Sequence, residues 1–250
     1  MSTEQNSQFL RSAEKFYIFK PYTEEKNFVK FFFQAFSAKA AKENLMPVLT
    51  FSLGPLETNC HLYQNGTDAL IIDPSGHMVD ILTEIKNKKL KIQGILLTHL
   101  HFDHVYGCAE LESFMDTPIM AGKEDIEISD VLISSAVRYG LPKVDEFHPV
   151  PLAEGIHKFG SIEVDVRHVP GHSPGSLAYY IKDENIVFTG DVLFYRSIGR
   201  SDLPMGDFEL LAKSIREKLY TLPENTVVYC GHGPETTIGD ERIKNSFVRI

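Results

Sequence analysis

The sequence of 250 residues is poor in cysteine and lacks a long apolar run. Its three cysteines are Cys60, Cys108 and Cys230, and none of them forms a CxxC pair. An odd, sparse set does not support a disulfide framework, so we interpret all three as small core residues of a protein from a reducing compartment, the cytoplasm. No apolar run approaches the roughly 20 residues of a bilayer-spanning helix, and no transmembrane segment is expected.

Basic charge is also scarce. The chain has 25 lysines and arginines against 34 aspartates and glutamates, which gives a net charge of −9. Because a nucleic-acid backbone is bound through a basic footprint, this balance argues against a nucleic-acid partner. The sequence carries no signal for an oligomeric state.

Glycine is absent from residues 1–46, which we predict to form an N-terminal extension to a main domain over residues 47–250. One stretch of the extension has helical spacing and predicts an amphipathic helix with the apolar face Phe28, Phe31, Phe32, Ala35 and Phe36. Such a helix could pack on the main domain, form a dimer contact, cover an active site or lie on a membrane surface. The same stretch precedes a signal-peptidase-like Ala38-Lys39-Ala40, but Lys30 interrupts it, so export is the weaker alternative.

From Pro47 onward, apolar stretches of strand and helix length alternate, with glycines at the turns. The predicted strands are Val48–Ser52, Cys60–Gln64, Ala69–Asp73, Ile92–Thr98, Ile162–His168, Leu177–Lys182, Asn185–Thr189 and Thr226–Cys230. The predicted helices are His77–Lys88, His104–Phe114, Glu124–Tyr139, Asp207–Leu219 and Asp240–Asn245. Asp207 is a suitable N-cap for its helix.

The strongest chemical signal is a cluster of four ligand-type residues directly after an apolar run: His99, His101, Asp103 and His104. Burial alone does not explain such a cluster, because buried polar groups are costly unless they are paired. Alternation places the first three on one side of an extended turn, and His104 then begins the next helix. Imidazole together with carboxylate is a donor set that zinc favours.

Three further ligand-type residues each follow a predicted strand: His172, Asp191 and His232. A single histidine after a strand is more often structural than catalytic. Strands deliver their carboxyl ends to one edge of a sheet, however, where loops converge on a site. In conjunction with the first cluster, these residues predict a metal site. The histidines that fit no such pattern are expected to be surface or structural residues: His61, His77, His148, His157 and His168.

The segments HLHFDH, PGHSPGS, FTGD and CGHG, in this order and spacing, resemble the metallo-β-lactamase superfamily over residues 47–250. The resemblance implies an α/β fold, the four-layer αβ/βα sandwich, in which two mixed sheets face each other with helices outside. It also implies that Asp73, in Ile71-Ile72-Asp73-Pro74, orients the site from behind the ligands.

The resemblance further implies two groups of ligands joined by a bridging carboxylate: His99, His101 and His172 for one metal, Asp103, His104 and His232 for the other, and Asp191 between them. Seven ligands are too many for one four-coordinate zinc and suit two metals that share a carboxylate and a hydroxide. We expect zinc, with iron and manganese as alternatives.

The segments 198–207 and 231–242 resemble the short glyoxalase II-like branch. That branch implies hydrolysis of a thioester of the S-lactoylglutathione type, with Asp103 orienting the attacking hydroxide and Arg200 and Ser201 facing the substrate. Alternatively, Arg200 only pins its loop to a nearby aspartate. The rival functions are a mononuclear iron persulfide dioxygenase, a lactonase and a metal-binding scaffold without turnover.

Overall fold

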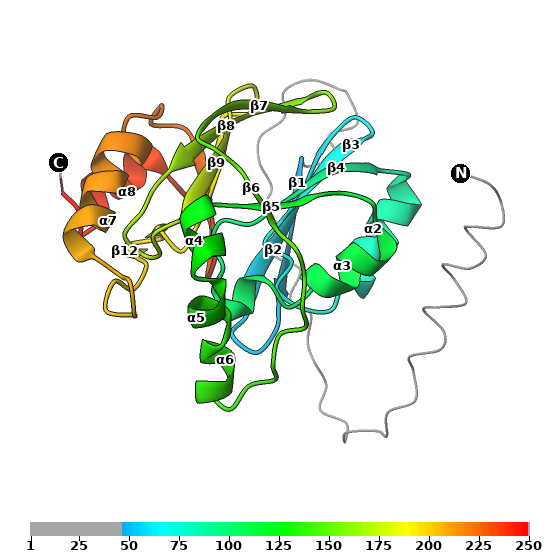
Figure 1. Cartoon of the computed structure of the whole chain (residues 1–250). Coiled ribbons are helices and arrows are strands. Elements are labelled where there is room, and N and C mark those ends of the chain that lie inside the picture. Colours follow the sequence, from blue (N-terminus) through cyan, green and yellow to red (C-terminus); the bar gives the residue numbers. More distant parts are fainter. Residues whose placement is uncertain (1–46, 250) are drawn as a thin grey trace, which may run out of the picture. The chain divides into compact units, whose positions relative to one another are not determined.

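The computed structural model describes residues 47–249, which contain two six-stranded sheets (Figure 1). In the first sheet the strand order follows the chain, and neighbouring strands are antiparallel up to β3 and parallel from there on. Its strands are β1 (Val48–Leu53), β2 (Thr58–Asn65), β3 (Asp68–Ile72), β4 (Lys91–Leu96), β5 (Ile119–Ala121) and β6 (Val150–Pro151).

The second sheet has the order β14-β13-β10-β9-β8-β7, and its one parallel pair is β10 with β13. Its strands are β7 (Gly155–Phe159), β8 (Ile162–His168), β9 (Leu177–Ile181), β10 (Ile186–Gly190), β13 (Val227–Cys230) and β14 (Thr236–Thr237). A two-stranded hairpin, β11 (Leu193–Phe194) and β12 (Ser197–Ile198), follows β10.

Helices cover the outer face of each sheet (Figure 1). Helices α2 (Val79–Lys88) and α3 (Cys108–Phe114) cover the first sheet. Helix α7 (Phe208–Ser214), its π-helical continuation η2 (Ile215–Leu219) and α8 (Ile238–Lys244) cover the second. Three short helices follow β5: α4 (Lys123–Glu127), α5 (Ser129–Ile133) and α6 (Ser135–Arg138).

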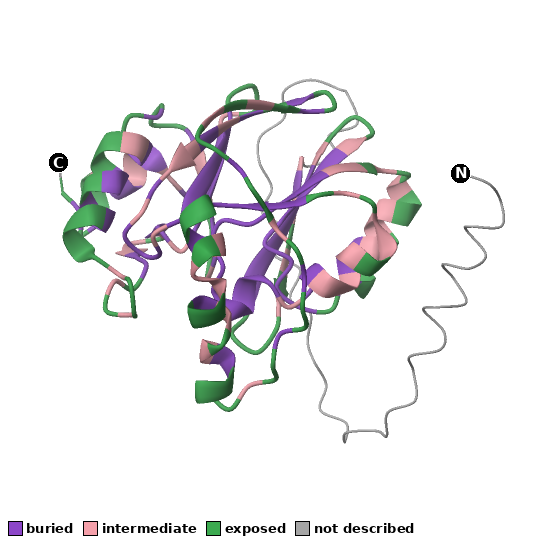
Figure 2. Cartoon of the chain, in the orientation of Figure 1, coloured by how far each residue is buried: buried purple, intermediate pink, exposed green. Residues whose placement is uncertain are grey.

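Three apolar clusters lie between the four layers, because side chains alternate across each strand. In β3, Ile71 faces the α2–α3 layer, whereas Leu70 and Ile72 face the second sheet. In β10, Val187 faces the α7–α8 layer and Phe188 faces the first sheet. Figure 2 shows the result: the central strands are buried, whereas the helices are exposed along their outward sides. The predicted four-layer α/β sandwich is confirmed.

All eight predicted strands are present, but two of the predicted helices are wrong in part. The stretch Glu124–Tyr139 forms α4, α5 and α6 instead of one helix. The Ser135 hydroxyl donates to the Leu132 carbonyl at 2.6 Å, and such local hydrogen bonds compete with a continuous helix. His104 does not begin α3 but ends a 3-10 turn, η1 (Phe102–His104). Helix α3 starts only after Gly107, whose amide donates to the Pro74 carbonyl at 2.7 Å.

The three cysteines are free and buried, as predicted. The predicted amphipathic helix, the signal-like stretch and the proposed extension over residues 1–46 lie outside the described residues. Within residues 47–249, no helix has the length and apolar character that a membrane crossing needs.

Asp207 caps α7 as the sequence predicts, since its Oδ1 accepts a hydrogen bond from the Leu210 amide at 2.9 Å. We expect Asp207→Ala to lower the free energy of unfolding by about 1 kcal/mol, the usual cost of a lost N-cap. Urea denaturation of the two proteins measures the difference. Asp207→Ser restores an acceptor and should recover most of the loss; equal stability of the alanine and serine variants would contradict the capping role.

Candidate metal centre

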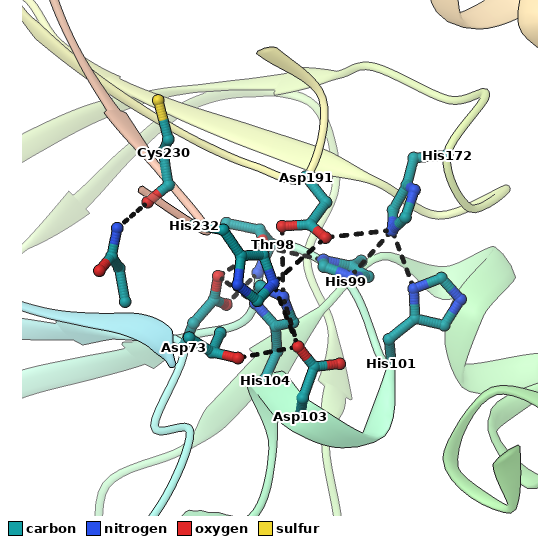
Figure 3. A network of polar contacts seen from close by, with 12 residues as sticks. Asp73, Thr98, His99, His101, Asp103, His104, His172, Asp191, Cys230 and His232 are labelled. Atoms are coloured by element: carbon teal, nitrogen blue, oxygen red, sulfur yellow. Dashed lines mark hydrogen bonds and ion pairs between the residues drawn. The ribbon is translucent and has the colours of Figure 1, made fainter. Parts of the chain in front are cut away.

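Loops from both sheets converge on one set of polar side chains (Figure 3). The first sheet delivers the loop after β4, which carries the four clustered ligand-type residues. The second sheet delivers His172 after β8, Asp191 directly after β10 and His232 after β13. Because β10 and β13 are parallel neighbours, Asp191 and His232 leave the sheet at the same edge. All seven predicted ligands therefore lie together.

The first group consists of three buried imidazoles: His99, His101 and His172. The Nε2 atom of His172 lies 2.9 Å from Nδ1 of His101 and 3.2 Å from Nε2 of His99. Burial, followed by the neighbouring imidazoles, lowers the pKa of His99 and lowers that of His101 to about 3. These two rings are therefore neutral at physiological pH and present lone pairs.

The second group consists of Asp103, His104 and His232. The Asp103 Oδ2 atom lies 3.2 Å from Nε2 of His232 and 3.5 Å from Nε2 of His104. Asp191 lies between the two groups, because its Oδ2 is 3.5 Å from Nε2 of His232 and 3.7 Å from Nε2 of His172. This is the position expected of a bridging carboxylate.

Charge distinguishes the second group from the first. Burial opposes a positive charge on His104, but the carboxylates of Asp103, Asp191 and Asp73 outweigh it and raise its pKa. Burial likewise opposes a positive charge on His232, but the hydrogen bond to Asp103 and the charge of Asp191 outweigh it and raise the pKa of His232. Burial in turn opposes ionisation of Asp103 and Asp191, yet the imidazoles beside them lower both pKa values. The two carboxylates are thus ionised and offer negative charge to a cation.

Asp73 lies behind the ligands and fixes the tautomers of two of them. Its Oδ2 accepts a hydrogen bond from the Thr98 hydroxyl at 2.6 Å and from Nδ1 of His104 at 3.0 Å. Since the Thr98 hydroxyl proton is used in this way, its oxygen accepts from Nδ1 of His99 at 3.0 Å. Both imidazoles therefore turn an unprotonated Nε2 toward the centre when they are neutral.

The backbone at Asp73 is strained to reach this position. Its φ is 51°, in the left-handed region, which costs a non-glycine residue roughly 1–2 kcal/mol. Strain of this kind persists only where surrounding contacts hold it, and Oδ1 of Asp73 also accepts from the Thr98 amide at 2.7 Å. The strained residue is thus held by the same strand end that carries His99.

His172 is oriented from the other sheet. Its Nδ1 donates to the Arg200 carbonyl at 2.7 Å, which leaves its Nε2 as a lone pair facing Nε2 of His99. A cation bound here could accept both of these lone pairs. Two further central atoms, His104 Nε2 and Asp191 Oδ1, are buried and lie 3.4 Å apart, but neither makes a hydrogen bond of good geometry to any described residue. A buried polar atom of this kind needs a partner, and metal ions would supply it. The donor set therefore fits metal binding.

Two glycines allow the strand ends to approach so closely. A Cβ atom at Gly190 would meet the Thr98 hydroxyl, and Gly190 also has a positive φ of 49°. A Cβ atom at Gly231 would meet Oδ1 of Asp191 and lie 2.9 Å from Cε1 of His104. The close packing of Asp191 against the first sheet thus requires glycine at both positions.

The predicted substrate residues lie in the loop after β12. The Arg200 side chain is exposed and makes a double hydrogen bond to Asp202, at 2.9 Å and 2.8 Å. This pair is the alternative raised from the sequence, in which the arginine pins its loop. Tyr139 lies close enough to contribute to the raised pKa of Arg200, after the larger effect of Asp202. Ser201 is half-buried in the same loop.

Sequence reasoning missed two residues that hold ligands in place. Thr58 donates its hydroxyl to Oδ2 of Asp103 at 2.8 Å, and Asp125 accepts from the loops that carry His99, His101 and His172. Neither residue belongs to a recognisable motif, and both act on residues distant in the sequence. No signal in the sequence alone marks them.

Cys230 lies near the centre without contributing to it. Its side chain points away from the ligand cluster in Figure 3, and burial raises its pKa to about 12. Its carbonyl accepts from the side chain of Asn59 at 2.9 Å. His61, which was expected to be a surface or structural residue, is buried; its Nε2 donates to the Cys230 carbonyl at 3.2 Å, and its Nδ1 lies 2.9 Å from the Thr50 hydroxyl. Burial lowers its pKa to about 3.

This chain belongs to the metallo-beta-lactamase superfamily, whose sequence profile matches residues 53–232. The family and the paired ligand groups together imply a binuclear metal site in a metal-dependent hydrolase.

Three relatives are similar over nearly their full length. "Hydroxyacylglutathione hydrolase GloC" of Haemophilus influenzae is 37% identical over 209 residues, which are 82% of this chain and 96% of that protein. The crystal structure of "BLEG-1 B3 metallo-beta-lactamase" is 39% identical with a TM-score of 0.74, covering 80% of this chain and 99% of that one. The structure of "TTHA1623 in a di-iron-bound form" is also 39% identical with a TM-score of 0.74, covering 80% and 100%.

Because Asp73 orients one ligand of each group, Asp73→Asn should weaken metal binding at both. An amide cannot accept all three hydrogen bonds, and loss of such supporting contacts typically costs about 10- to 100-fold in metal affinity. Competition with a chromophoric chelator would measure the stepwise affinities. Asp80→Asn, which removes the same charge from an exposed position of α2, is the matched control. Unchanged affinity in Asp73→Asn would sink this role.

Proposed function

We propose that this chain is a two-metal hydrolase that cleaves a thioester of the S-lactoylglutathione type. The observation that carries the proposal is the arrangement of six ligand-type residues in two groups of three with Asp191 between them. The similarity to a protein named hydroxyacylglutathione hydrolase supports the choice of a thioester. The proposed ligands are those expected from the sequence: His99, His101 and His172 in one group, Asp103, His104 and His232 in the other, and Asp191 between them.

When bound, the two metals would polarise the substrate carbonyl and lower the pKa of coordinated water to about 7. The proposed part of Asp103 is to orient the attacking water. Its Oδ2 already accepts from Thr58 at 2.8 Å and lies 3.2 Å from Nε2 of His232. The carboxylate is therefore fixed in direction, and its second oxygen, Oδ1, can accept a hydrogen bond from the water.

The neutral imidazoles of His99 and His101 supply lone pairs without first losing a proton, because their pKa values are lowered. Asp191 supplies negative charge to both groups. Zinc suits this set of imidazole and carboxylate donors. Iron is the second candidate, because a relative that is 39% identical has been crystallised in a di-iron-bound form.

Arg200 is the proposed contact to the carboxylate or peptide portion of the thiol carrier. The Arg200 side chain is 61% exposed, and the side chain of its partner Asp202 is 70% exposed. Exposed ion pairs contribute only about 0–1 kcal/mol, so a substrate carboxylate can replace Asp202 at little cost. Arginine binds carboxylates through two parallel hydrogen bonds, the geometry that it already makes with Asp202. Ser201 follows it in the same loop.

A β-lactamase is the rival function with a specific observation behind it, namely the 39% identity to a structure named B3 metallo-beta-lactamase. Both reactions attack a carbonyl carbon, so the ligand cluster alone does not distinguish them. A mononuclear iron dioxygenase acting on a persulfide is the other rival. Its ligands are similar, so the segment 231–242 and the metal that is bound distinguish the two functions.

We expect the purified protein to contain about two metal ions per chain, predominantly zinc, and to hydrolyse S-lactoylglutathione. Elemental analysis gives the metal content, and absorbance at the thioester band gives the turnover. The same preparation is assayed with a chromogenic cephalosporin and for oxygen uptake on glutathione persulfide. Turnover of the cephalosporin alone would reassign the enzyme as a β-lactamase. One iron per chain with oxygen uptake alone would reassign it as a dioxygenase.

The role of Arg200 is tested by Arg200→Ala. Loss of a hydrogen-bonded charge in substrate binding should raise KM for S-lactoylglutathione about tenfold while kcat changes little. Steady-state kinetics measure both constants. Asp202→Asn distinguishes the two interpretations of the arginine: it should leave KM unchanged or lower it if Arg200 contacts substrate. A rise in KM equal to that of Arg200→Ala would show that the pair only pins the loop.

A further inference from the structure

A single carboxylate lies behind the first group of ligands and touches none of the second. Asp125, in α4, has no exposed surface. Its Oδ2 accepts from the Leu100 amide at 3.0 Å and from the Ser173 hydroxyl at 2.7 Å, and its Oδ1 accepts from the Gly175 amide at 2.6 Å. All three donors thus point at one buried anion.

The donors belong to the two loops that carry the first group. Leu100 stands between His99 and His101, and Ser173 directly follows His172. The carboxylate therefore holds these two loops, which come from different sheets, against each other. Gly175 packs so closely that a Cβ atom there would lie 2.5 Å from the Asp125 amide nitrogen.

The second group has separate support from the start of β2. The Thr58 hydroxyl donates to Asp103, and the backbone amide of Asn59 donates to the Gly231 carbonyl at 2.7 Å. The Asn59 side chain donates to the carbonyls of Cys230 and Gly233, both at 2.9 Å. The contacts of Asn59 hold the backbone before and after His232, and none of the donors to Asp125 takes part in them.

We propose that Asp125 is a positioning residue that controls metal affinity at the first group, His99, His101 and His172, and leaves the second group unaffected. The inference rests on the two-metal site of the proposed function but not on the thioester substrate. Asp125 contacts no ligand side chain directly; it acts by setting the separation of the two loops from which the imidazoles project.

The three donors around Asp125 make Asp125→Asn an informative substitution, because it changes the hydrogen bonding while keeping the size of the side chain. Three donors face the carboxylate, and an amide offers one acceptor oxygen in place of two. If the amide oxygen faces Gly175, the NH₂ group faces the Leu100 amide; if it faces Leu100, the NH₂ group faces the Gly175 amide. Either orientation places two donors against each other in a buried site and drives the loops apart.

The experiment measures zinc affinity in backgrounds that retain one group at a time. His232→Ala removes a ligand of the second group, so the tighter remaining site is the first; His172→Ala does the reverse. We expect Asp125→Asn to lower zinc affinity about 10- to 100-fold in the His232→Ala background and less than about twofold in the His172→Ala background. Calorimetric titration of the chelator-treated protein with zinc gives each affinity without reference to activity.

Two further variants keep the test informative. Asp130→Asn, an exposed carboxylate of α5, controls for loss of charge and should change neither affinity. Ser173→Ala removes one of the three donors to Asp125, together with the acceptor of the Ser176 hydroxyl at 2.8 Å, and should produce a smaller loss confined to the first group. It serves as the primary variant if Asp125→Asn does not fold, as judged by urea denaturation.

The outcomes are separable. Equal losses in both backgrounds, or no loss in either, would overturn the positioning role of Asp125 while leaving the proposed two-metal site intact. Fewer than two zinc ions bound by the unsubstituted protein would instead contradict the proposed function itself.

Discussion

The site depends on one constraint: an imidazole ligand must present its lone pair at the centre, and a partner on its other nitrogen fixes which nitrogen carries that lone pair. Asp73 meets this requirement for a ligand of each group, for His104 directly and for His99 through Thr98. The Arg200 carbonyl meets it for His172. The strained backbone of Asp73 and the glycines at the ends of β10 and β13 follow from bringing these partners together. Much of the local structure therefore serves to fix which ring nitrogen of these imidazoles carries the proton.

Most of the fold was accessible from the sequence because the central strands are apolar on both faces. In β3 and β10 each residue faces one of two apolar layers, so the strands read as continuous apolar runs. The strand β7 was missed for the opposite reason. It lies at an edge of its sheet, and its Ile156 is 62% exposed, so the pattern of apolar residues does not mark the buried face.

The proposed ligands could also be picked out, because four of them are clustered in the sequence and the others follow strands. The residues that hold them were not. Thr58 contacts a residue 45 positions away, and Asp125 contacts residues 25, 48 and 50 positions away. A buried aspartate in a short helix looks, in the sequence, like any charged residue on a helix surface. Its role is defined only by the packing of two loops from different sheets.

The division of ligands between the sheets has a consequence for folding. The first sheet contributes His99, His101, Asp103 and His104, and the second contributes His172, Asp191 and His232. Neither half of the sandwich can complete either group alone, so a metal bound by one group would link the first sheet to the second. The free energy of binding adds to the free energy that holds the two sheets together. If the proposed ligands hold the metals, opening of the sandwich would require their release, and bound metal would make the protein more resistant to unfolding.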